Sequence, residues 1–458
     1  MSTLSTLSDV YFDQIQNPVY GVMSDLATGN FHVMSSKANG NFIFHTTDKN
    51  FIATTQININ VANAGLSCVF LDASYFLGFE SGHLVWRDNE SHQIDLTKNF
   101  TQLVLQIERT ANQLILSFAG LGKTFESIIV SLDCNNENQV AKVGLFAQSD
   151  LPVDFTNTRL VFPAWKGLVP YTDYIGSRLE ILDVETGQRN IVYHTIDGIE
   201  APNWTPDGNK LIFNSKGRLF YFDLQTKQID EINTGFAVKN NNDHVLSFDG
   251  SLLGISHHAA EHNGDSIVYL MNPAGGVPKA LTLTGPSFLH GISPDNHYVI
   301  YTARRNGKFN IYRTTTDGVG KETQMTFSDK LDDGSEYSPD GKAIFFNSAR
   351  EGKMEIWRVD AHGNNPVRLT QDGLNDWFPH VSPDMKQIIF LSYLPSMDPD
   401  KHPYYQHVYL RLMSYAGGNA KVVAYLYGGQ GTINVPSWSP DSRYVAFVSN
   451  SQMGDIKN

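Results

Sequence analysis

The segment EYSPDGKAIFFNS (336–348) decides the fold, because it has the pattern of a strand, a tight turn and a second strand. Proline fixes φ at the first corner of the turn, the aspartate accepts hydrogen bonds from the backbone of the turn, and a glycine follows. The run AIFF then has the β-branched and aromatic character of a strand. The segment therefore predicts a β-hairpin.

The same pattern occurs six times along the chain. The other copies, which align without gaps, are NWTPDGNKLIFNS (203–215), VLSFDGSLLGISH (245–257), GISPDNHYVIYTA (291–303), HVSPDMKQIIFLS (380–392) and SWSPDSRYVAFVS (437–449). Their Ser or Thr positions, together with Ser338, are spaced by 42, 46, 45, 44 and 57 residues. A period of about 45 residues is typical of one four-stranded propeller blade.

Each copy but the last is followed by a second hairpin. These second halves are the segments 217–232, 265–282, 309–326, 354–370 and 408–424. One more second half, SRLEILDVETGQRNIVY (177–193), precedes the first copy, whereas the copy at 437–449 lacks one. These two halves can form one blade, which removes the open sheet edges. We therefore expect an all-β chain whose residues 177–458 form a six-bladed β-propeller closed by its N- and C-terminal strands.

The spacing and the SPDG-type signature resemble the TolB-like β-propeller repeat family over about residues 165–458. The segments LDDGSEYSPDG, NDWFPHVSPD and GGQGTINVPSWSPD are similar to one bacterial branch of that family. TolB proper is a periplasmic partner of a cell-envelope complex. The resemblance therefore implies the fold, and it implies a non-catalytic protein-interaction scaffold as an alternative function.

Residues 1–163 contain no propeller repeat and show alternating apolar and polar segments with frequent turn signals, which is typical of a β-sandwich. The hairpin QLVLQIERTANQLILSF, followed by KVGLFAQS and DFTNTRLVF, resembles concanavalin A-like (laminin-G-like) jelly rolls. Such domains often bind sugars, and the resemblance implies Tyr75, Trp86 and Arg87 as contacts, with a buried sandwich core as the alternative. The expected domains are 1–163, a linker at 164–176, and 177–458.

Composition excludes several classes of partner. The chain has 458 residues, with 34 Lys+Arg against 47 Asp+Glu and a net charge of −13. This balance argues against nucleic acid and against an anionic membrane surface as partners. The start MSTLSTLSDVYF lacks the basic and apolar regions of a signal peptide, and two cysteines, Cys68 and Cys134, form no disulfide framework. We expect a cytoplasmic protein.

Propeller geometry separates structural from functional residues. The SPDG-type turns lie on one face, so their repeated aspartates (207, 249, 295, 340, 384 and 441) are expected to form turns. The loops before first strands and after second strands lie on the other face. Eight of the 15 histidines fall in these loops, at positions 244, 257, 258, 262, 290, 380, 402 and 407. The sequence therefore predicts a polar ligand site at the channel mouth.

Metal binding is one interpretation of this cluster. His290 and His380 stand three and two residues before the Ser of their turns, and Gln430 and Asp333 could complete the set. Imidazoles with nearby amide or carboxylate oxygens suit a divalent ion such as Mn²⁺, Zn²⁺, Fe²⁺ or Ni²⁺. Alternatively, these side chains satisfy buried backbone groups at the channel mouth.

The remaining candidates would bind or transform a substrate. Asp333, Trp377, Asn434, His244 and His257 are the predicted substrate-binding residues; Trp377 offers a flat face for a sugar, or else plugs the channel. A metal would acidify a proton beside a carbonyl or carboxylate, and the acid/base group would be His258, Arg305 or Arg350.

A weaker resemblance concerns oligogalacturonate lyases, TolB-like propellers that hold a metal through His and Gln side chains and use an arginine base. His380 in WFPHVSPD stands in a comparable place, but Phe378 replaces an expected second His and six blades replace seven. The predicted function is binding of a small carbohydrate-like ligand, with metal-assisted lysis or hydrolysis as the reaction. The alternatives are a sugar sensor without turnover and a scaffold whose protein partner contacts the insertion at 393–407.

Overall fold

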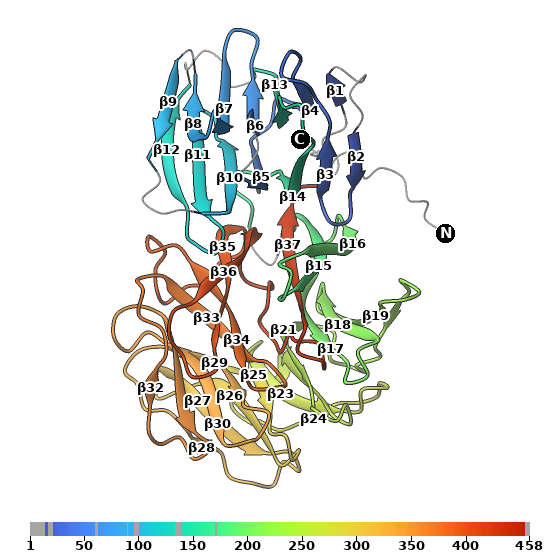
Figure 1. Cartoon of the computed structure of the whole chain (residues 1–458). Helices are drawn as coiled ribbons and strands as arrows, with labels where there is room; N and C mark the ends of the chain where they lie inside the picture. Colours follow the sequence, from blue (N-terminus) through green and yellow to red (C-terminus); the bar gives the residue numbers. More distant parts are fainter. Residues whose placement is uncertain are drawn as a thin grey trace. The chain divides into compact units, whose positions relative to one another are not determined.

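The computed structural model describes residues 14–16, 22–59, 63–88, 90–95, 100–132, 139–169 and 172–453 (Figure 1). The segment MSTLSTLSDVYF and Cys134 lie outside this part of the chain. Within it every regular element is a β-strand, except for one 3₁₀ turn at Ala260–His262. A search of the same residues finds no helix with the length and apolarity needed to cross a membrane. The chain is therefore all-β, as predicted.

The chain divides into two compact units. Unit 1 comprises Met1–Leu168, Gln188–Ile191 and Ser451–Asn458, and unit 2 comprises Val169–Gly187 and Val192–Asn450.

The described residues of unit 1 form two sheets of seven strands each. In spatial order the first sheet is β1 (Gln14–Gln16), β4 (Asn41–Thr47), β13 (Ala141–Ala147), β6 (Asn63–Val69), β7 (Ser74–Glu80), β8 (His83–Arg87) and β9 (Ser91–Ile94). The second is β12 (Glu126–Ser131), β11 (Gln113–Gly120), β10 (Gln102–Arg109), β5 (Phe51–Asn58), β14 (Val153–Val161), β3 (Asn30–Val33) and β2 (Val22–Asp25). The predicted hairpin QLVLQIERTANQLILSF corresponds to the antiparallel pair β10 and β11.

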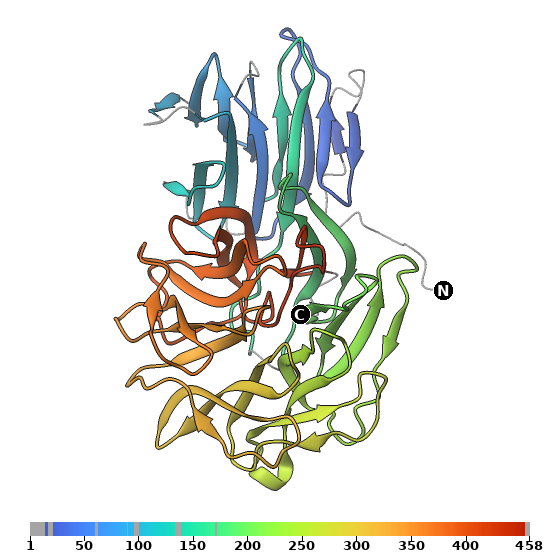
Figure 2. The same ribbon diagram turned by 60° about the horizontal axis from the view of Figure 1, so that its bottom comes forward.

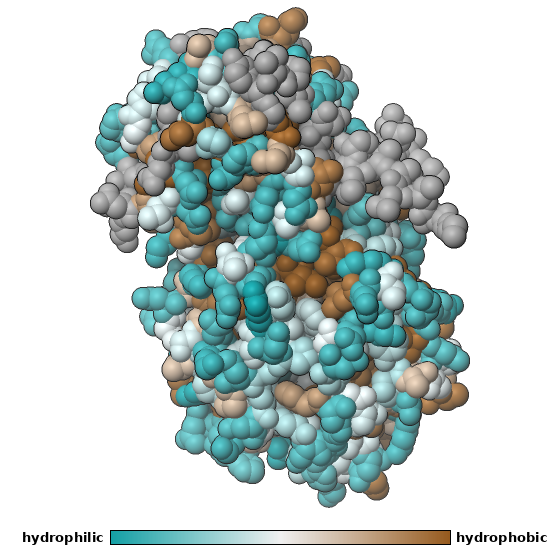
Figure 3. All heavy atoms as spheres, turned by 45° about the vertical axis from the view of Figure 1, so that its right-hand side comes forward, coloured by the Kyte–Doolittle hydropathy of each residue, from teal (hydrophilic) through white to brown (hydrophobic). Residues whose placement is uncertain are grey.

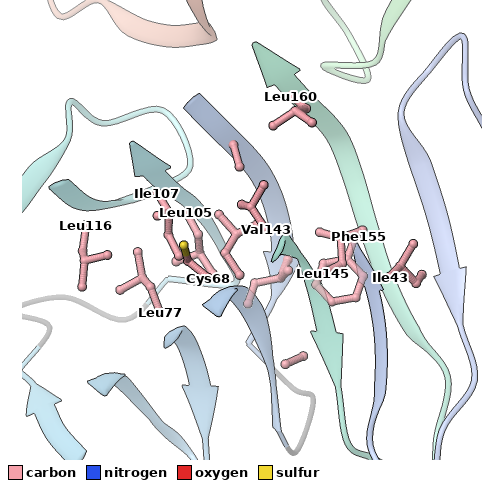
Figure 4. Close-up of a cluster of buried hydrophobic side chains, with 14 of the residues drawn as sticks. Ile43, Cys68, Leu77, Leu105, Ile107, Leu116, Val143, Leu145, Phe155 and Leu160 are labelled. Carbon is pink, nitrogen blue, oxygen red and sulfur yellow. The ribbon is translucent and has the colours of Figure 1, made fainter. Parts of the chain in front are cut away.

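One apolar core lies between these two sheets (Figure 4). Leu105 and Ile107 of β10 and Leu145 of β13 are fully buried in it, because alternate residues of a strand point to the same face. Cys68 is also fully buried there, and burial raises the pKa of its thiol to about 12. It therefore behaves as a small apolar core residue.

The predicted sugar contacts of unit 1 lie on the first sheet. Trp86 is half-buried and stacks on His92, with ring centroids 4.1 Å apart. Nη1 of Arg87 lies 3.3 Å from Oε1 of Glu80. Tyr75 packs edge-on against Phe70.

Unit 2 contains five four-stranded antiparallel sheets that follow one another in chain order (Figure 2). They are β17 (Glu200–Trp204), β18 (Lys210–Ser215), β19 (Arg218–Asp223) and β20 (Ile229–Glu231); β21 (Asn240–Leu246), β22 (Leu253–His258), β23 (Ser266–Met271) and β24 (Lys279–Ala280); β25 (Ser287–Ile292), β26 (Tyr298–Arg305), β27 (Lys308–Thr315) and β28 (Thr323–Gln324); β29 (Asp332–Tyr337), β30 (Ala343–Ser348), β31 (Glu355–Asp360) and β32 (Val367–Arg368); and β33 (Asn375–Val381), β34 (Gln387–Tyr393), β35 (Gln406–Ser414) and β36 (Lys421–Gly428).

A further sheet joins the two ends of unit 2. Its order is β16 (Arg189–Thr195), β15 (Gly176–Asp183) and β37 (Tyr444–Ser451). A bridge between Trp438 and Val445 extends it, and Nη2 of Arg443 lies 2.8 Å from Oδ2 of Asp183. The two half-repeats that lack a neighbour in sequence thus share one sheet.

The repeated aspartates form turns, as the pattern predicts. In the 338–343 turn the hydroxyl of Ser338 donates to Oδ1 of Asp340 at 2.7 Å, and the amide of Lys342 donates to the same oxygen at 3.1 Å. Gly341 has a φ of 69°, the left-handed conformation that favours glycine. These aspartates are therefore part of the fold.

The first strands of the sheets surround a common centre. Asn203 of β17 accepts a hydrogen bond from the amide of Leu246 in β21 and donates to the carbonyl of Pro436, at 2.8 and 2.7 Å. Glu336 of β29 accepts from the amide of Val381 in β33 at 3.1 Å. Neighbouring first strands are thus cross-linked, and the segment 429–438 returns to β17.

The outer surface is mainly hydrophilic on the face drawn in Figure 3. Large exposed hydrophobic side chains such as Leu71, Leu283 and Val319 lie on different loops. Scattered apolar side chains of this kind are normal on a protein surface.

Candidate functional site

The first strand of each four-stranded sheet contains a register shift. The shifts fall between Glu200 and Asn203, Asn240 and His244, Leu289 and Gly291, Asp333 and Glu336, and Trp377 and His380. A bulge leaves a residue out of the ladder and redirects its side chain. Ionisable side chains gather at these shifts. We call Glu200, Asp243, His290, Asp333 and His402 the channel cluster.

An ion pair forms the middle of the channel cluster. Nε2 of His290 lies 2.9 Å from Oδ1 of Asp333. The same oxygen accepts hydrogen bonds from the Thr302 hydroxyl at 2.7 Å and from the Gly334 amide at 2.8 Å. The two predicted residues therefore do meet, but as partners of each other.

The pKa values of this pair move apart. Burial opposes the charge on Asp333, but the His290 imidazole and the hydrogen bonds outweigh it and lower the pKa of that carboxyl to about 2. Burial likewise lowers the pKa of His290, but the carboxyl groups of Asp243 and Asp333 outweigh it, so the net shift is upward. Both shifts favour the charged forms of the pair.

Two further carboxyl groups of the cluster titrate near neutrality. Asp243 is 5% exposed, and burial raises its pKa to about 7 against the attraction of His290. Burial also raises the pKa of Glu200 to about 7, and the charge on Asp243 adds to that shift. Buried groups with pKa values near 7 are a frequent mark of functional sites.

The insertion between β34 and β35 supplies the fifth member, His402. Its Nε2 lies 3.7 Å from Oδ2 of Asp333. Its ring packs on Trp377 and Phe378, with centroid distances of 4.3 and 5.4 Å. Burial lowers the pKa of His402 to about 4, so the imidazole is neutral.

Glycine allows this insertion to approach the segment 428–434. A Cβ at Gly429 would lie 2.1 Å from the carbonyl oxygen of Pro403, which follows His402. The amide of Gln430 donates to that same carbonyl at 3.2 Å. The insertion is thereby fixed beside the cluster.

Each of the three predicted metal ligands has a partner of its own. Nδ1 of His380 lies 2.6 Å from Oε2 of Glu336, and its Nε2 contacts the carbonyl of Ile433. Oε1 of Gln430 accepts from Nδ2 of Asn434 at 3.2 Å. His290 is committed to Asp333. Among the described residues no group of three or more His, Cys, Asp or Glu side chains is arranged to hold a metal ion. The residues do not fit the predicted metal centre, and we derive no step through one.

The predicted acid/base residues lie outside the channel cluster. Arg305 donates to Glu322 through Nε at 2.8 Å and Nη2 at 2.7 Å. Arg350 donates to both carboxylate oxygens of Asp332 at 3.1 Å. His258 is exposed, and its Nδ1 lies 3.0 Å from the Gly264 carbonyl. These contacts give all three residues structural partners.

The predicted substrate-binding residues divide into two groups. Asp333 belongs to the channel cluster, Trp377 stacks on His402, and the backbone of Asn434 lies beside His290. By contrast, His244 is fully buried, with a pKa lowered to about 4 by burial. His257 accepts a hydrogen bond from the Lys239 amide at 3.2 Å. Trp377 is itself fully buried, so its ring is not an open platform.

The buried polar atoms of the described residues that make no hydrogen bond include two donors next to the cluster. They are Nδ2 of Asn242, which precedes Asp243 in β21, and Nε1 of Trp377. Buried polar groups are nearly always paired, so these two donors call for a hydrogen-bond acceptor. Sequence reasoning missed Glu200, Asp243 and the role of His402. The polar run NNNDH (240–244), directly before a predicted first strand, was the available signal.

Comparisons with known proteins identify the C-terminal unit. A model of the TolB β-propeller domain matches residues 292–396. An uncharacterized protein of Agrobacterium fabrum is 42% identical over 273 residues, which are 59% of this chain and 92% of that protein. The solved structure of a candidate TolB from Agrobacterium tumefaciens is 40% identical, covers 61% of this chain and 100% of its own, and has a TM-score of 0.59.

An oligogalacturonate lyase in complex with manganese is a more distant structural neighbour. It is 14% identical, covers 85% of this chain and 98% of its own, and has a TM-score of 0.39. That score is too low to carry an argument about function. The TolB domain match and the 40% identity to the solved candidate TolB agree, and through its C-terminal propeller this chain belongs to the TolB β-propeller family.

Proposed function

We propose that unit 2 is a closed six-bladed propeller that binds a small carbohydrate-like ligand at the channel cluster. The observation that carries the proposal is a pair of carboxyl groups, that of the buried Asp243 and that of the half-buried Glu200, whose pKa values are raised to about 7 beside the ion pair of His290 and Asp333. Such groups are costly to bury without a function.

The chemistry of the cluster suits a polyhydroxylated ligand. Sugar sites combine a few convergent donors and acceptors with an apolar surrounding. Asn242 and Trp377 supply buried donors that make no hydrogen bond, whereas Asp243 and Glu200 supply acceptors. Phe378 lies close to His290, with ring centroids 6.2 Å apart, and adds apolar surface.

The same groups could move a proton to or from the ligand. A carboxyl group with a pKa of about 7 is half protonated at neutral pH, which is the condition for efficient general acid or base catalysis. Elimination or hydrolysis of a glycosidic bond is therefore the reaction class that we propose, with Asp243 rather than Arg305 or Arg350 as the acid/base group.

We also propose an architecture for each unit, and the sheets of that unit support it. The sheet made of β16, β15 and β37, with the bridge at Trp438, supplies the sixth blade and its closure. For unit 1 we propose a concanavalin A-like jelly roll, because two seven-stranded sheets face each other across one core.

Calorimetric titration of the full chain with a panel of oligosaccharides tests the function. We expect binding to the wild type, at least a tenfold loss of affinity in Asp243→Asn or Asp333→Asn, and no change in His362→Asn, whose exposed side chain is on a turn of the other face. Binding that is equal in all four proteins would overturn the proposed site.

A second candidate function, a protein-interaction propeller, is favoured by the 40% identity to the candidate TolB structure. It predicts that a protein partner, and no sugar, binds the full chain. It also predicts that substitutions in the exposed part of the insertion, such as Asp400→Ala and Lys401→Ala, weaken that binding, whereas Asp243→Asn leaves it unchanged.

A further inference from the structure

Carboxyl groups outnumber cations in the channel cluster. Glu200, Asp243 and Asp333 contribute three carboxyl groups, whereas His290 contributes one imidazole, whose net pKa shift is towards the cationic form. His402 is neutral, because burial lowers its pKa to about 4. Arg305 and Arg350, the cations expected from sequence, are bonded to Glu322 and Asp332 instead.

Within the described part of the chain, His290 is the positively charged group among those that mainly act on Glu200 and Asp243. The groups that act on Glu200 are the Tyr404 hydroxyl and the carboxyl group of Asp243. Tyr174 and Tyr405 also lie close enough to Glu200 to interact electrostatically. Asp243 interacts with His290, Asp333 and the Asn241 side chain. An anionic ligand entering here would meet uncompensated negative charge with little water to screen it.

A second observation is independent of the carboxyl groups. Nδ2 of Asn242 and Nε1 of Trp377 belong to side chains that are 2% and 0% exposed, and neither donates a hydrogen bond. Each lies next to a cluster residue, Asn242 by sequence and Trp377 through its ring contact with His402. Unpaired donors require acceptors, and sugar hydroxyls can supply them.

We propose that the ligand of the channel cluster is positively charged, and that amino sugars, rather than neutral sugars or sugar acids, are its chemical class. This inference rests on the proposed function. An ammonium group would donate charge-assisted hydrogen bonds to Asp243 and Glu200, and the hydroxyls would accept from Asn242 and Trp377. The cluster thus differs in charge preference from a site built for polyuronates.

The test compares three oligosaccharides of equal length against the full chain at pH 7. The probes are a glucosamine tetramer, cellotetraose with the same linkage and no amine, and a tetramer of galacturonate. We expect the glucosamine tetramer to bind at least about tenfold more tightly than cellotetraose, and the galacturonate tetramer to bind most weakly.

Two neutralised variants and one control locate the effect. Asp243→Asn and Glu200→Gln keep the shape of the side chain, and each should reduce the preference for the amine by about tenfold. Neutral side chains at the buried Asp243 and the half-buried Glu200 should not impair folding, which the melting temperature checks. Glu185→Gln, at an exposed position of unit 2, should keep the full preference.

The possible failures are distinguishable. Equal affinity for the amine and neutral tetramers, tighter binding of galacturonate, or an amine preference that survives in both neutralised variants would overturn the inference and leave sugar binding intact. Failure of all three tetramers to bind the wild type would overturn the proposed function and the inference together.

Discussion

Glu336 and His380 tie two neighbouring sheets together at the centre of unit 2. Oε2 of Glu336, in β29, lies 2.6 Å from Nδ1 of His380, in β33, and Oε1 of the same carboxylate accepts from the Val381 amide. Nε2 of His380 contacts the carbonyl of Ile433, so the link continues to the segment that leads back to β17. Both side chains are more than nine-tenths buried. This geometry makes His380 a cross-link between strands.

The first prediction follows from that role. His380→Ala would leave the Glu336 carboxylate buried without its partner, which costs about 3–5 kcal/mol of folding stability. His380→Gln keeps a donor and should cost less. Urea unfolding monitored by tryptophan fluorescence measures both variants. A loss below about 1 kcal/mol in His380→Ala would contradict the cross-link.

The second prediction concerns the pH dependence caused by Asp243. The unfolded chain ionises this residue near its ordinary pKa, around pH 4, whereas the folded protein retains the proton until about pH 7. Folding stability is therefore lost as the pH rises from 4 to 7, and above pH 7 the full cost of about 2–4 kcal/mol persists. The Asp243→Asn variant has no ionisable group at this position, so it does not lose this stability as the pH rises.

Urea unfolding at pH 4.5 and pH 8 tests the sign. Asp243→Asn should be close to the wild type in stability at pH 4.5 and more stable at pH 8. Glu200→Gln should behave in the same way, because burial raises the pKa of Glu200 to about 7. A stability difference that does not change with pH would contradict both assignments.

The sequence predicted the strands of unit 2 more completely than the site. The pattern around Ser338 is local, since proline, aspartate and glycine determine the turn and the flanking residues form β29 and β30. His290 and Asp333 were also candidates. Their partnership was not visible, because it depends on register shifts in two different strands.

Other members of the site depend on longer-range packing. His402 reaches Asp333 only because the insertion folds back against Gly429. Trp377 is buried under that histidine and does not offer an open face. Pairwise partners such as Glu336 for His380, 44 residues apart, cannot be inferred from spacing in a single sequence.

The third prediction concerns the ion pair of His290 and Asp333. Asp333→Asn removes the carboxylate 2.9 Å from Nε2 of His290. Burial is the largest influence on the pKa of His290, and it lowers that pKa. In the variant fewer negative charges oppose this effect, so the pKa of His290 should fall below its wild-type value. Histidine ring signals in an NMR titration measure this shift, with His290→Gln for assignment.

The same substitution should change the stability profile in acid. Because the folded pKa of Asp333 is lowered to about 2, its contribution is present above about pH 4 and is lost as the pH falls through 2. Asp333→Asn should therefore be less stable than the wild type at pH 7, by about 3 kcal/mol, with the difference shrinking towards pH 2. An unchanged His290 pKa in the variant would contradict the pairing.

The fourth prediction separates a structural from a catalytic role for the two arginines. Arg350 is held between Phe346 and Trp357, with centroid distances of 5.2 and 4.7 Å, and its partner Asp332 is fully buried. The partner of Arg305, Glu322, keeps a side-chain exposure of 34%. Arg350→Ala should therefore cost about 3–5 kcal/mol, and Arg305→Ala about 1–2 kcal/mol, because water can solvate the carboxylate left behind in the second case.

Ligand affinity completes the test of the arginines. Arg350 is bonded to Asp332 and Arg305 to Glu322, and neither carboxylate belongs to the channel cluster. Both variants should therefore retain wild-type ligand affinity at a temperature where they are folded. If Arg305→Ala proved as destabilising as Arg350→Ala, the argument from the burial of the partner carboxylate would be wrong. An ion pair that only stabilises the sheet cannot change ligand affinity while the protein stays folded. A tenfold loss of affinity in folded Arg350→Ala would therefore show that Arg350 takes part in ligand binding.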